Sequence, residues 1–596
     1  MTTVRPEQPL PASHSPLESL SRRNVLRASS ALTTGAIIGA GAPASHRASA
    51  QTPSPHPQAV VSAHALATDA GMEMLGLGGT AADAAVAVAA VLSVVEGWFS
   101  NVLGGEIWGL YYDAGAGELT SLDAVGPVGA NVDVDAYEAI ADQPGAHQSI
   151  LPGAWDGWML WLDRYGALDL GAVLSPAIRI AREGFPASAL MIDWLRRLED
   201  DVRASPESAR TYVIDGELPS TGDTITIPDL AATFERLAES FATSTGPTRS
   251  DAIQAARDYY YRGPLAEEVV AWSDANGGFL SIEDFAAYEA QLVPPISIDY
   301  TDEITVFQCP PNSQGITMLL GLNILKGVDF TGQNIESPDV VHAQVEALKL
   351  AFADRYAFVG DPERVQIPLE ELLSDAYADA QRSRIDMQQA MSWPIASGLP
   401  RPGASNTSTF HIIDGQGNIA GATTSIGAQF MIAGDTGIHM NARMSFCSLD
   451  PQEPNYMTPG YKVRHTSCPY MVFRNGRPRL SGGNTGADSQ PQAQLQQFVS
   501  MVDFGLPAQR AVDRPRFIST SFPSTVYPFE VLGVLQMEPG FTDELLEALT
   551  ARGHTIGEQG IVGSAAIVQV NEDGSVELGV ESRSDTASGQ VVAPNR

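Results

Sequence analysis

Lysine is nearly absent from this chain of 596 residues. Only Lys326, Lys349 and Lys462 occur, and none is followed by Ser or Thr, which excludes a phosphate-binding P-loop. Arginine supplies almost all of the positive charge, and 35 basic residues against 70 acidic ones give a net charge of −35. Such a surface repels nucleic acid and anionic membranes, so we expect neither as a partner. A saline habitat and a GC-rich genome would explain this composition equally well.

Cysteine is also scarce, and Cys309, Cys447 and Cys468 lie far apart. This spacing excludes a disulfide-rich scaffold and a thiolate zinc site. The chain also lacks the H-E-x-x-H pattern of zinc hydrolases. We therefore expect no metal and no cofactor. No stretch after residue 50 has the ~20 apolar residues that a helix needs to cross a bilayer.

The first fifty residues have the pattern of an export signal. Residues 21–26, "SRRNVL", carry paired arginines and precede the small, uncharged run "ASSALTTGAIIGAGAPA". An A-x-A cleavage site follows at residues 48–50. The pattern predicts a twin-arginine-type signal peptide over residues 1–50, and therefore a periplasmic or secreted protein with no membrane anchor after processing. A membrane anchor, the alternative, is disfavoured because the run is short and rich in Gly and Ala.

The sequence pattern changes near residue 394 from mainly helical to mainly strand-like. Before it, helical patterns dominate, among them residues 62–79 and the almost wholly apolar run 81–95, and "IWGLYYDAGAGELTSLDA" predicts a hairpin. "WPIASGLPRPGASN" is a linker or loop. After it, three pairs of β-runs joined by Asn, Asp and Gly predict further hairpins. The pattern favours an α+β fold in which helices cover stacked sheets.

Three hydroxyl side chains, Thr407, Ser408 and Thr409, lie where the linker meets the first of these β-runs. A threonine hydroxyl becomes a nucleophile beside a base, and the α-amino group of the same residue can be that base if the preceding bond is cut. Such an amine titrates at about 8, which suits a general base at neutral pH. Cleavage between Asn406 and Thr407 would therefore create both groups on one residue. The local sequence by itself favours a simpler alternative, a turn of hydroxyl residues that leads into a strand.

Several blocks follow one another from about Ala59 to the C-terminus, among them "GMEMLGLGGTAADAAVAVAAVLSVVE", "LPGAWDGW" and "EALKLAFADRYAFVGDPERV". In these blocks and in their order, the chain as a whole resembles the γ-glutamyltranspeptidase family of N-terminal-nucleophile hydrolases. The resemblance implies a four-layer αββα sandwich formed by two chains from one precursor. It implies a large, helix-rich subunit at 51–406 and a small, sheet-rich subunit at 407–596, which stay associated after the precursor cuts itself.

The resemblance also implies the catalytic groups. Counted back from Asp414 in "HIIDGQGN", the family's nucleophile falls on Thr407, and the processing site falls on the Asn406–Thr407 bond. Ser425 falls where a second threonine of the family contacts the nucleophile. The backbone N–H groups of the oxyanion hole fall on Thr485 and Gly486.

Most residues that would hold a γ-glutamyl group in the family are replaced. Val125 stands where an arginine would bind the α-carboxylate of the substrate, and valine cannot supply that charge. Gly427 and Phe446 are further replacements. The positions that could still bind a substrate are Arg443, His465, Thr466 and Thr409. Arg443 could instead pair with a structural acid, and His465 could be a satisfied polar residue of the core.

Three functions fit these residues. The first is an exported, self-processing amidohydrolase or acylase that cleaves a small-molecule amide through an acyl-enzyme on Thr407, with an altered acyl pocket. The second is a true γ-glutamyl hydrolase or transferase acting on glutathione-like substrates. The third is a non-catalytic binding homologue.

Overall fold

Two β-sheets face each other between layers of helices. The computed structural model describes residues 54–392, 394–395, 407–523, 525–526, 530–561 and 563–594, all of them in one structural unit. The predicted signal peptide, most of the predicted linker and Asn406 lie outside these residues. Within the described part of the chain, no helix has both the length and the apolar character to cross a membrane.

The first sheet has seven strands in the order β18-β1-β9-β10-β2-β3-β6. Every neighbouring pair is antiparallel, and β9 lies directly after the predicted processing point. One neighbour of β9, strand β1, comes from a distant part of the sequence. The other neighbour, β10, follows β9 directly. The strands are β1 Gln58–Ser62, β2 Glu106–Asp113, β3 Glu118–Ala124, β6 Gln291–Val293, β9 Ser408–Ile413, β10 Ile419–Ser425 and β18 Ser588–Val592.

The second sheet has six antiparallel strands in the order β17-β16-β12-β11-β8-β7. The strands are β7 Ile296–Asp299, β8 Ile304–Gln308, β11 Tyr470–Arg474, β12 Arg477–Asn484, β16 Ala565–Val570 and β17 Val576–Val580. Strand β12 packs on β9 across the interface between the sheets. A Cβ on Gly483 would lie 2.3 Å from Thr409 Oγ1, so glycine is needed there to leave room for the side chains of β9. His411 Nδ1 and Ser481 Oγ, 2.7 Å apart, form a hydrogen bond across the same interface.

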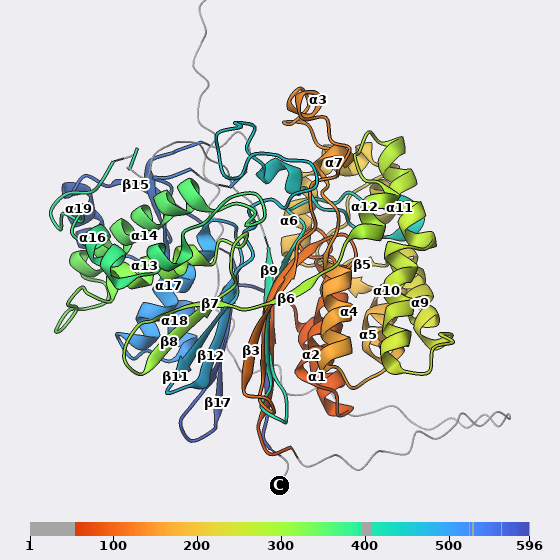
Figure 1. Ribbon diagram of the computed structural model, residues 1–596, viewed down its shortest axis with the longest axis horizontal. Coiled ribbons are helices and arrows are strands. Elements are labelled where there is room, and N and C mark those ends of the chain that lie inside the picture. Colours follow the sequence, from red (N-terminus) through yellow and green to blue (C-terminus); the bar gives the residue numbers. More distant parts are fainter. Residues whose placement is uncertain are drawn as a thin grey trace, which may run out of the picture. The chain divides into compact units, whose positions relative to one another are not determined.

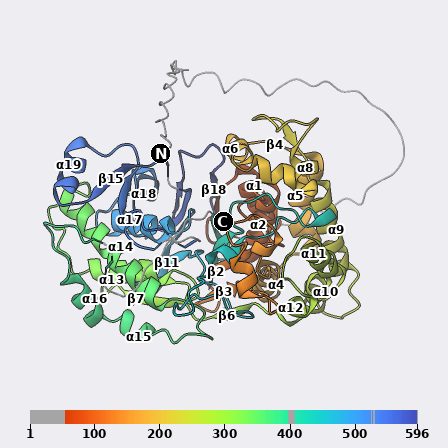
Figure 2. The same ribbon diagram turned by 90° about the horizontal axis from the view of Figure 1, so that it is seen from above.

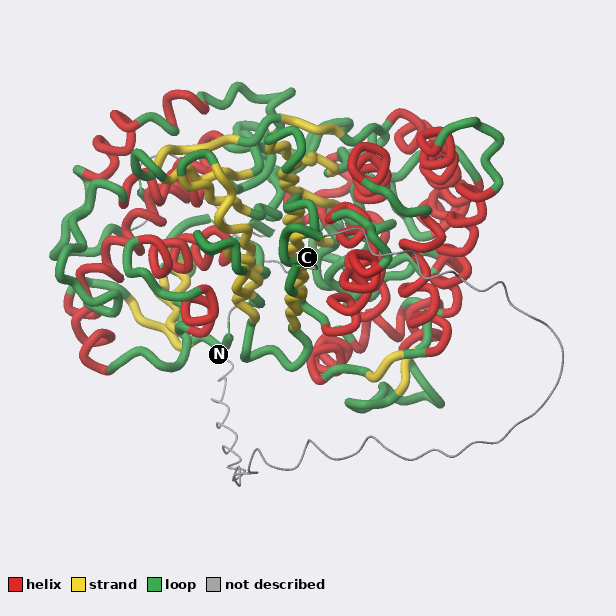
Figure 3. The backbone as a smooth tube through the Cα atoms, turned by 90° about the horizontal axis from the view of Figure 1, so that it is seen from below, coloured by secondary structure: helices red, strands yellow, loops and turns green. Residues whose placement is uncertain are grey.

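Helices cover the outer face of each sheet (Figure 1). Helix α2 contacts β9 and β10 of the first sheet, whereas α13 contacts β8 and α17 contacts β12 of the second. Viewed from above and from below, the two helical groups lie on opposite sides of the sheets (Figures 2 and 3, respectively). The first group includes α1 Ala65–Gly76, α2 Ala81–Val95, α4 Ala154–Tyr165, α5 Leu170–Glu183, α9 Pro228–Ala242 and α10 Arg249–Tyr261; the second includes α13 Ile316–Leu325, α14 Pro338–Phe358, α17 Ser489–Val502 and α18 Ala508–Asp513. The architecture is therefore the predicted αββα sandwich.

The remaining α-helices and strands of the described residues lie outside these two groups and the two sheets. They are α3 Val134–Glu138, α6 Ala189–Arg197, α7 Glu199–Ala204, α8 Pro206–Tyr212, α11 Pro264–Ala275, α12 Ile282–Ala287, α15 Leu369–Leu372, α16 Asp375–Arg382, α19 Asp543–Ala551, β4 Phe185–Pro186, β5 Thr224–Ile225, β13 Phe517–Ser519, β14 Val534–Met537 and β15 Thr555–Glu558.

The local sequence explains why helix α2 begins and lies where it does. Thr80 accepts hydrogen bonds from the first turn while Asp83 accepts one from the Thr80 N–H, a capping box that satisfies N–H groups left over at a helix start. Every residue of α2 is buried. A helix that is apolar all round belongs inside a large protein, and this one packs between the first sheet and α5.

The predicted hairpins are confirmed as β2–β3, β9–β10, β11–β12 and β16–β17. In the β11–β12 turn, Asn475 and Gly476 have φ of 52° and 72°, the left-handed conformation that two-residue hairpin turns require. The β9–β10 turn brings the two ends of "STFHIIDGQGNIAGATTS" side by side. Ser425, at the end of β10, is thereby placed next to the start of β9.

Candidate active site

The hydroxyl of Thr407 is held by two side chains at the start of β9. Ser425 Oγ donates a hydrogen bond to Thr407 Oγ1 at 3.2 Å, and Gln490 Nε2 donates another at 3.1 Å. Thr407 is only 2% exposed. The structure thus brings together Thr407 and Ser425, two residues expected from the sequence, and adds Gln490.

Sequence reasoning missed Gln490, although its position carried a signal. It lies in the first turn of α17, directly after the turn that was expected to form the oxyanion hole. The first turn of a helix lies beside the turn that precedes it, so one of its side chains can reach the same point. A glutamine amide has two donor hydrogens and can orient a hydroxyl without charge.

Ser408 and Thr409 point to opposite faces of β9, as successive residues of a strand do. Ser408 Oγ donates to Glu96 Oε2 at 3.0 Å on the helix-covered face. Thr409 Oγ1 lies between the sheets, 3.2 Å from the Ala422 carbonyl oxygen and 3.3 Å from Thr423 Oγ1. The contacts of Thr409 are thus with the protein itself, and its role in substrate binding stays a prediction.

A pocket of 350 Å³ opens beside Thr407 and Ser408. Helix α6, the end of β12 and the segment before β18 form its walls. The apolar lining comprises Ala63, Phe99, Leu190, Trp194 and Ile561, and the charged lining comprises Glu96, Asp193, Arg197, Glu581, Arg583 and Asp585. The volume suits a small molecule, and the nucleophile candidate lies in its wall.

Glu96 and Glu581 are buried carboxyl groups of this pocket, and Glu96 is the one without an ion pair within the described residues. It follows the last residue of α2 and is 3% exposed. Burial raises the pKa of Glu96 to about 7, the hydrogen bond from Ser408 opposes the rise, and the nearby charge of Asp585 adds to it. An acid with this pKa changes its charge within the physiological range.

Two arginines and two glutamates form a closed ionic network behind the pocket. Arg516 Nη2 lies 2.9 Å from Glu581 Oε2, and Arg583 Nη1 lies 2.8 Å from Glu538 Oε2. The guanidinium of Arg516 also donates to Asn484 Oδ1 at 3.0 Å. The network therefore balances its own charges and fixes the end of β12, where the expected oxyanion turn begins.

The backbone N–H groups of Thr485 and Gly486, which were expected to form the oxyanion hole, differ in their hydrogen bonding. The Thr485 N–H donates to the Ser564 carbonyl at 2.9 Å, and the Ser564 N–H donates to Thr485 Oγ1 at 2.6 Å. Gly486 has φ of 103°, where a side chain would be strained. The hydrogen bonds within the described residues leave the Gly486 N–H without a partner. Gly486 is therefore the better donor of the two, because Thr485 would first have to break its bond to Ser564.

Arg443 is fully buried and paired with an acid of the protein. Its Nε lies 3.2 Å from Glu106 Oε2, and its guanidinium lies 4.5 Å above the ring of Phe446. His465 Nε2 lies 3.7 Å from the same Glu106 oxygen. Burial raises the pKa of Glu106 to about 8 and lowers that of Arg443, and the opposite charge of each partner opposes both shifts.

This arrangement is the alternative weighed from the sequence, in which Arg443 pairs with a structural acid. Arg443, His465 and Thr466 are all buried, and none lines the 350 Å³ pocket. Substrate binding by these three residues therefore stays a prediction.

Val125 lies in an apolar cluster where the family would place an arginine. The cluster is buried and includes Val128, Met444, Phe446 and Met457. Valine offers a carboxylate no donor, and burying a carboxylate without a partner costs several kcal/mol. The altered acyl pocket stays a prediction.

One group of described residues has the composition of a metal site. His342, Glu346 and His554 offer ligand atoms that all lie within 4.8 Å of one another. Their own contacts already satisfy them: His342 Nδ1 and His554 Nε2 share a hydrogen bond of 2.8 Å, and Lys349 Nζ lies 2.7 Å from Glu346 Oε1. An ammonium group beside the one carboxylate disfavours a divalent cation.

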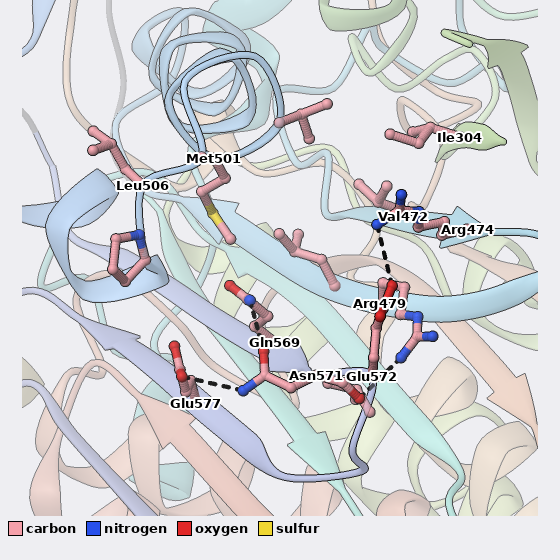
Figure 4. A pocket seen from close by; sticks show the side chains of 15 residues that line it. Ile304, Val472, Arg474, Arg479, Met501, Leu506, Gln569, Asn571, Glu572 and Glu577 are labelled. Carbon is pink, nitrogen blue, oxygen red and sulfur yellow. Dashed lines mark hydrogen bonds and ion pairs between the residues drawn. The ribbon is translucent and has the colours of Figure 1, made fainter. Parts of the chain in front are cut away.

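The pocket of 490 Å³ in Figure 4 lies elsewhere, among β11, β12, β16, β17 and the end of α17. Its polar groups bond to one another, with Asn571 Nδ2 donating to Glu577 Oε1 at 3.1 Å and Gln569 Nε2 donating to Asn571 Oδ1 at 2.9 Å. No nucleophilic side chain is among the residues described for its lining. Pocket size alone therefore does not locate the chemistry.

The αββα sandwich defines the class of protein, the N-terminal-nucleophile hydrolase fold. The chain belongs to the γ-glutamyltranspeptidase family, whose model matches residues 67–594. It is 35% identical over 544 residues to the glutathione hydrolase-like YwrD proenzyme of Bacillus subtilis (strain 168), covering 89% of this chain and 98% of that protein. It is 30% identical over 535 residues to the acylase ACY 1 proenzyme of Pseudomonas sp. (strain SE83), covering 87% and 90%.

A solved structure, cephalosporin acylase from Bacillus halodurans, superposes with a TM-score of 0.78 at 30% identity, covering 94% of this chain and 100% of that one. The enzymes of the family act on amide bonds as hydrolases or acyltransferases, and this chain is an enzyme of that kind.

Proposed function

We propose that this protein is an exported, self-processing amidohydrolase that uses Thr407 as its nucleophile and accepts an acyl group other than γ-glutamyl. The observation that carries the proposal is the setting of Thr407: it lies directly before β9, receives hydrogen bonds from Ser425 and Gln490, and lines a pocket of small-molecule size. The relatives' description as proenzymes supports cleavage of the precursor.

The proposed processing cuts the Asn406–Thr407 bond and divides the chain into subunits 51–406 and 407–596. Strand β9 pairs with β1 of the first segment and β10 pairs with β2, so the two subunits would remain joined by continuous sheet. Cleavage would leave Thr407 with a free α-amine next to its hydroxyl. Export through a signal peptide at 1–50 belongs to the same proposal and rests on the sequence pattern alone.

The proposed reaction has two stages. Thr407 Oγ1 attacks the amide carbonyl carbon while its proton passes to the α-amine of the same residue, and the tetrahedral oxyanion takes a hydrogen bond from the Gly486 N–H. The C–N bond then breaks, and the leaving amine takes the proton from the α-ammonium. Water, deprotonated by the α-amine, attacks the Thr407 ester and releases the carboxylic acid.

Ser425 and Gln490 position the nucleophile in this scheme. Both donate to Thr407 Oγ1, which directs the hydroxyl proton away from them and toward the amine. A misplaced nucleophile lowers the rate strongly, because the attack requires a near-ideal distance and angle.

A γ-glutamyl hydrolase or transferase is the second candidate. The similarity to a glutathione hydrolase-like protein favours it. The environment of Val125 and the pairing of Arg443 with Glu106 disfavour it, because both potential binding positions for the α-carboxylate are taken up by the protein's own contacts.

Intact mass of the chain without residues 1–50 tests the processing step, with Thr407→Ala as the control. We expect two fragments, the smaller beginning at Thr407, and a single chain for the variant. A folded wild-type chain that stays uncut would refute the proposal.

Turnover separates the two candidate substrates. γ-Glutamyl-p-nitroanilide should be cleaved at a near-zero rate, whereas a panel of simple acyl p-nitroanilides should contain a substrate. Rapid release from the γ-glutamyl compound would overturn the altered-pocket proposal and establish the second candidate.

A further inference from the structure

The pocket beside Thr407 contains more carboxyl groups than its cations neutralise. Two of its four acids are already paired: Asp193 lies 2.7 Å from Arg197, and Glu581 belongs to the balanced network with Arg516 and Arg583. Glu96 and Asp585 remain, and neither forms an ion pair with a described residue. The pocket therefore carries an excess of negative charge.

Of these two acids, Glu96 is the better candidate for binding a ligand in the pocket. It is 3% exposed and lines the pocket that Thr407 also lines, whereas Asp585 lies on the exposed side. Ser408 donates to one oxygen of Glu96, and the hydrogen bonds within the described residues leave the other oxygen without a donor. That oxygen is not among the fully buried atoms without a partner, and Glu96 lines the pocket, so a ligand in the pocket can reach it. A charged donor on the ligand would replace the water that the carboxylate loses when the ligand fills the pocket.

We propose that the substrate carries an ammonium group that binds Glu96 when the scissile amide lies at Thr407. This inference rests on the proposed function and narrows its substrate class to amides with a cationic group close to the carbonyl. The apolar wall made by Phe99 and Trp194 suits the hydrocarbon part of such a molecule, and an aromatic face also attracts an ammonium group. The requirement differs from that of a γ-glutamyl group, because no α-carboxylate is needed.

Three p-nitroanilides of equal length test the charge directly. The 4-aminobutyryl, pentanoyl and glutaryl compounds end in an ammonium, a methyl and a carboxylate group, respectively. We expect kcat/KM for the ammonium compound to exceed that of the methyl compound by about 10- to 100-fold, the range of a hydrogen bond to a charged group, and we expect the carboxylate compound to be the poorest. Equal rates for the first two would overturn the proposal.

The cation could belong to the acyl group or to the leaving amine. Pentanoyl-4-(aminomethyl)anilide and pentanoyl-4-ethylanilide provide the same comparison on the amine side. A preference for the cationic member of either pair supports the proposal and identifies the side. No preference in either pair refutes it.

Substitution identifies the carboxylate. Glu96→Gln keeps an acceptor for Ser408 but removes the charge, so the ratio of kcat/KM between the ammonium and methyl compounds should fall to near 1. Asp193→Asn is the matched control, because that carboxylate lines the same pocket and is already paired; its ratio should match the wild type. A ratio that survives in Glu96→Gln would overturn the assignment.

The wild type gives a second test that requires no variant to fold. Because the pKa of Glu96 is raised to about 7, its carboxylate forms as pH rises through that value, and the ammonium-to-methyl ratio should rise with it. The other charged groups that face the pocket are Asp585, Glu581, Arg583, Arg197, Asp193 and the α-amine expected on Thr407. Loss of the proton from that α-amine, at about pH 8, would also favour the ammonium compound, so a rise of the ratio centred at about pH 7 supports Glu96 and a rise centred at about pH 8 does not.

Two outcomes distinguish failure of the inference from failure of the proposed function. If Glu96 serves the α-amine of Thr407 instead, Glu96→Gln will slow both compounds equally, and the inference is wrong while the function stands. If none of the amides is cleaved, the proposed function fails, and the inference is then tested by calorimetric binding of 4-aminobutyramide and pentanamide. Tighter binding of 4-aminobutyramide that is lost in Glu96→Gln supports the inference. Equal binding of the two amides refutes it.

Discussion

Replacing Arg443 by methionine will separate a structural role of this arginine from a role in substrate binding. The variant leaves Glu106 buried without a counter-charge, although methionine fills similar space. Burial raises the pKa of Glu106 to about 8 even with Arg443 beside it, so the lone carboxyl will be protonated at pH 7. Holding a carboxyl protonated 2.5 pH units above its ordinary pKa of 4.5 costs about 3 kcal/mol, and breaking a buried pair costs about 3–5 kcal/mol.

The pH dependence has a definite sign. Folded Glu106 keeps a proton that the unfolded chain releases above pH 4.5, so the free energy of unfolding falls as pH rises, by about 1.4 kcal/mol per unit between about pH 5 and 8, in the wild type as well as in the variant. Loss of Arg443 raises the pKa of Glu106 further, so in the variant alone the fall should continue above pH 8. Urea midpoints of the wild type, Arg443→Met and the double variant Arg443→Met/Glu106→Gln at pH 5, pH 8 and about pH 9 measure this. An amide at position 106 does not titrate, so the double variant should lose this pH dependence and recover part of the stability.

Activity of the double variant then decides the role of Arg443. If the pair is structural, a double variant that recovers stability will also recover turnover. Loss of turnover in a stable double variant would mean that Arg443 contacts the substrate. An Arg443→Met chain as stable as the wild type at pH 8 would refute the reasoning about the buried pair.

Three further substitutions test the site and its scaffold. Gln490→Leu removes one of the two hydrogen bonds to Thr407 Oγ1 and should lower kcat about 10- to 100-fold with KM little changed, whereas an effect on KM alone would contradict a positioning role. Ser425→Ala should lower kcat similarly, and Ser425→Thr, which keeps the hydroxyl, should retain most of it; equal losses in both would show that the hydroxyl is not the relevant group. Gly104→Ala would place a Cβ 1.9 Å from the His439 carbonyl oxygen, so we expect little folded protein by size-exclusion chromatography, and normal yield would contradict the packing seen there.

The hairpins and helix α2 could be predicted from the sequence because their signals are local. Asn475 and Gly476 specify their turn through the backbone conformations they allow, and Thr80 and Asp83 mark a helix start through hydrogen bonds three residues apart. The neighbours of β9, the strand that follows Thr407, could not be predicted in this way. Strand β1 joins the sheet through pairing with β9 and β18, hundreds of residues away, and short strands acquire their identity from such partners.

Thr407 and Ser425 were identified by family resemblance, and the β9–β10 hairpin accounts for their proximity. Gln490 and Glu96 approach the same point from the two opposite helical layers, and no spacing in the sequence connects them. The sequence by itself thus determined the elements and the order of the blocks, and it indicated the residue that we propose as the nucleophile. Only the tertiary structure decided which acid neutralises Arg443, which carboxyl group faces the pocket unpaired and which amide holds the threonine hydroxyl, because these depend on contacts between segments that local conformation does not encode.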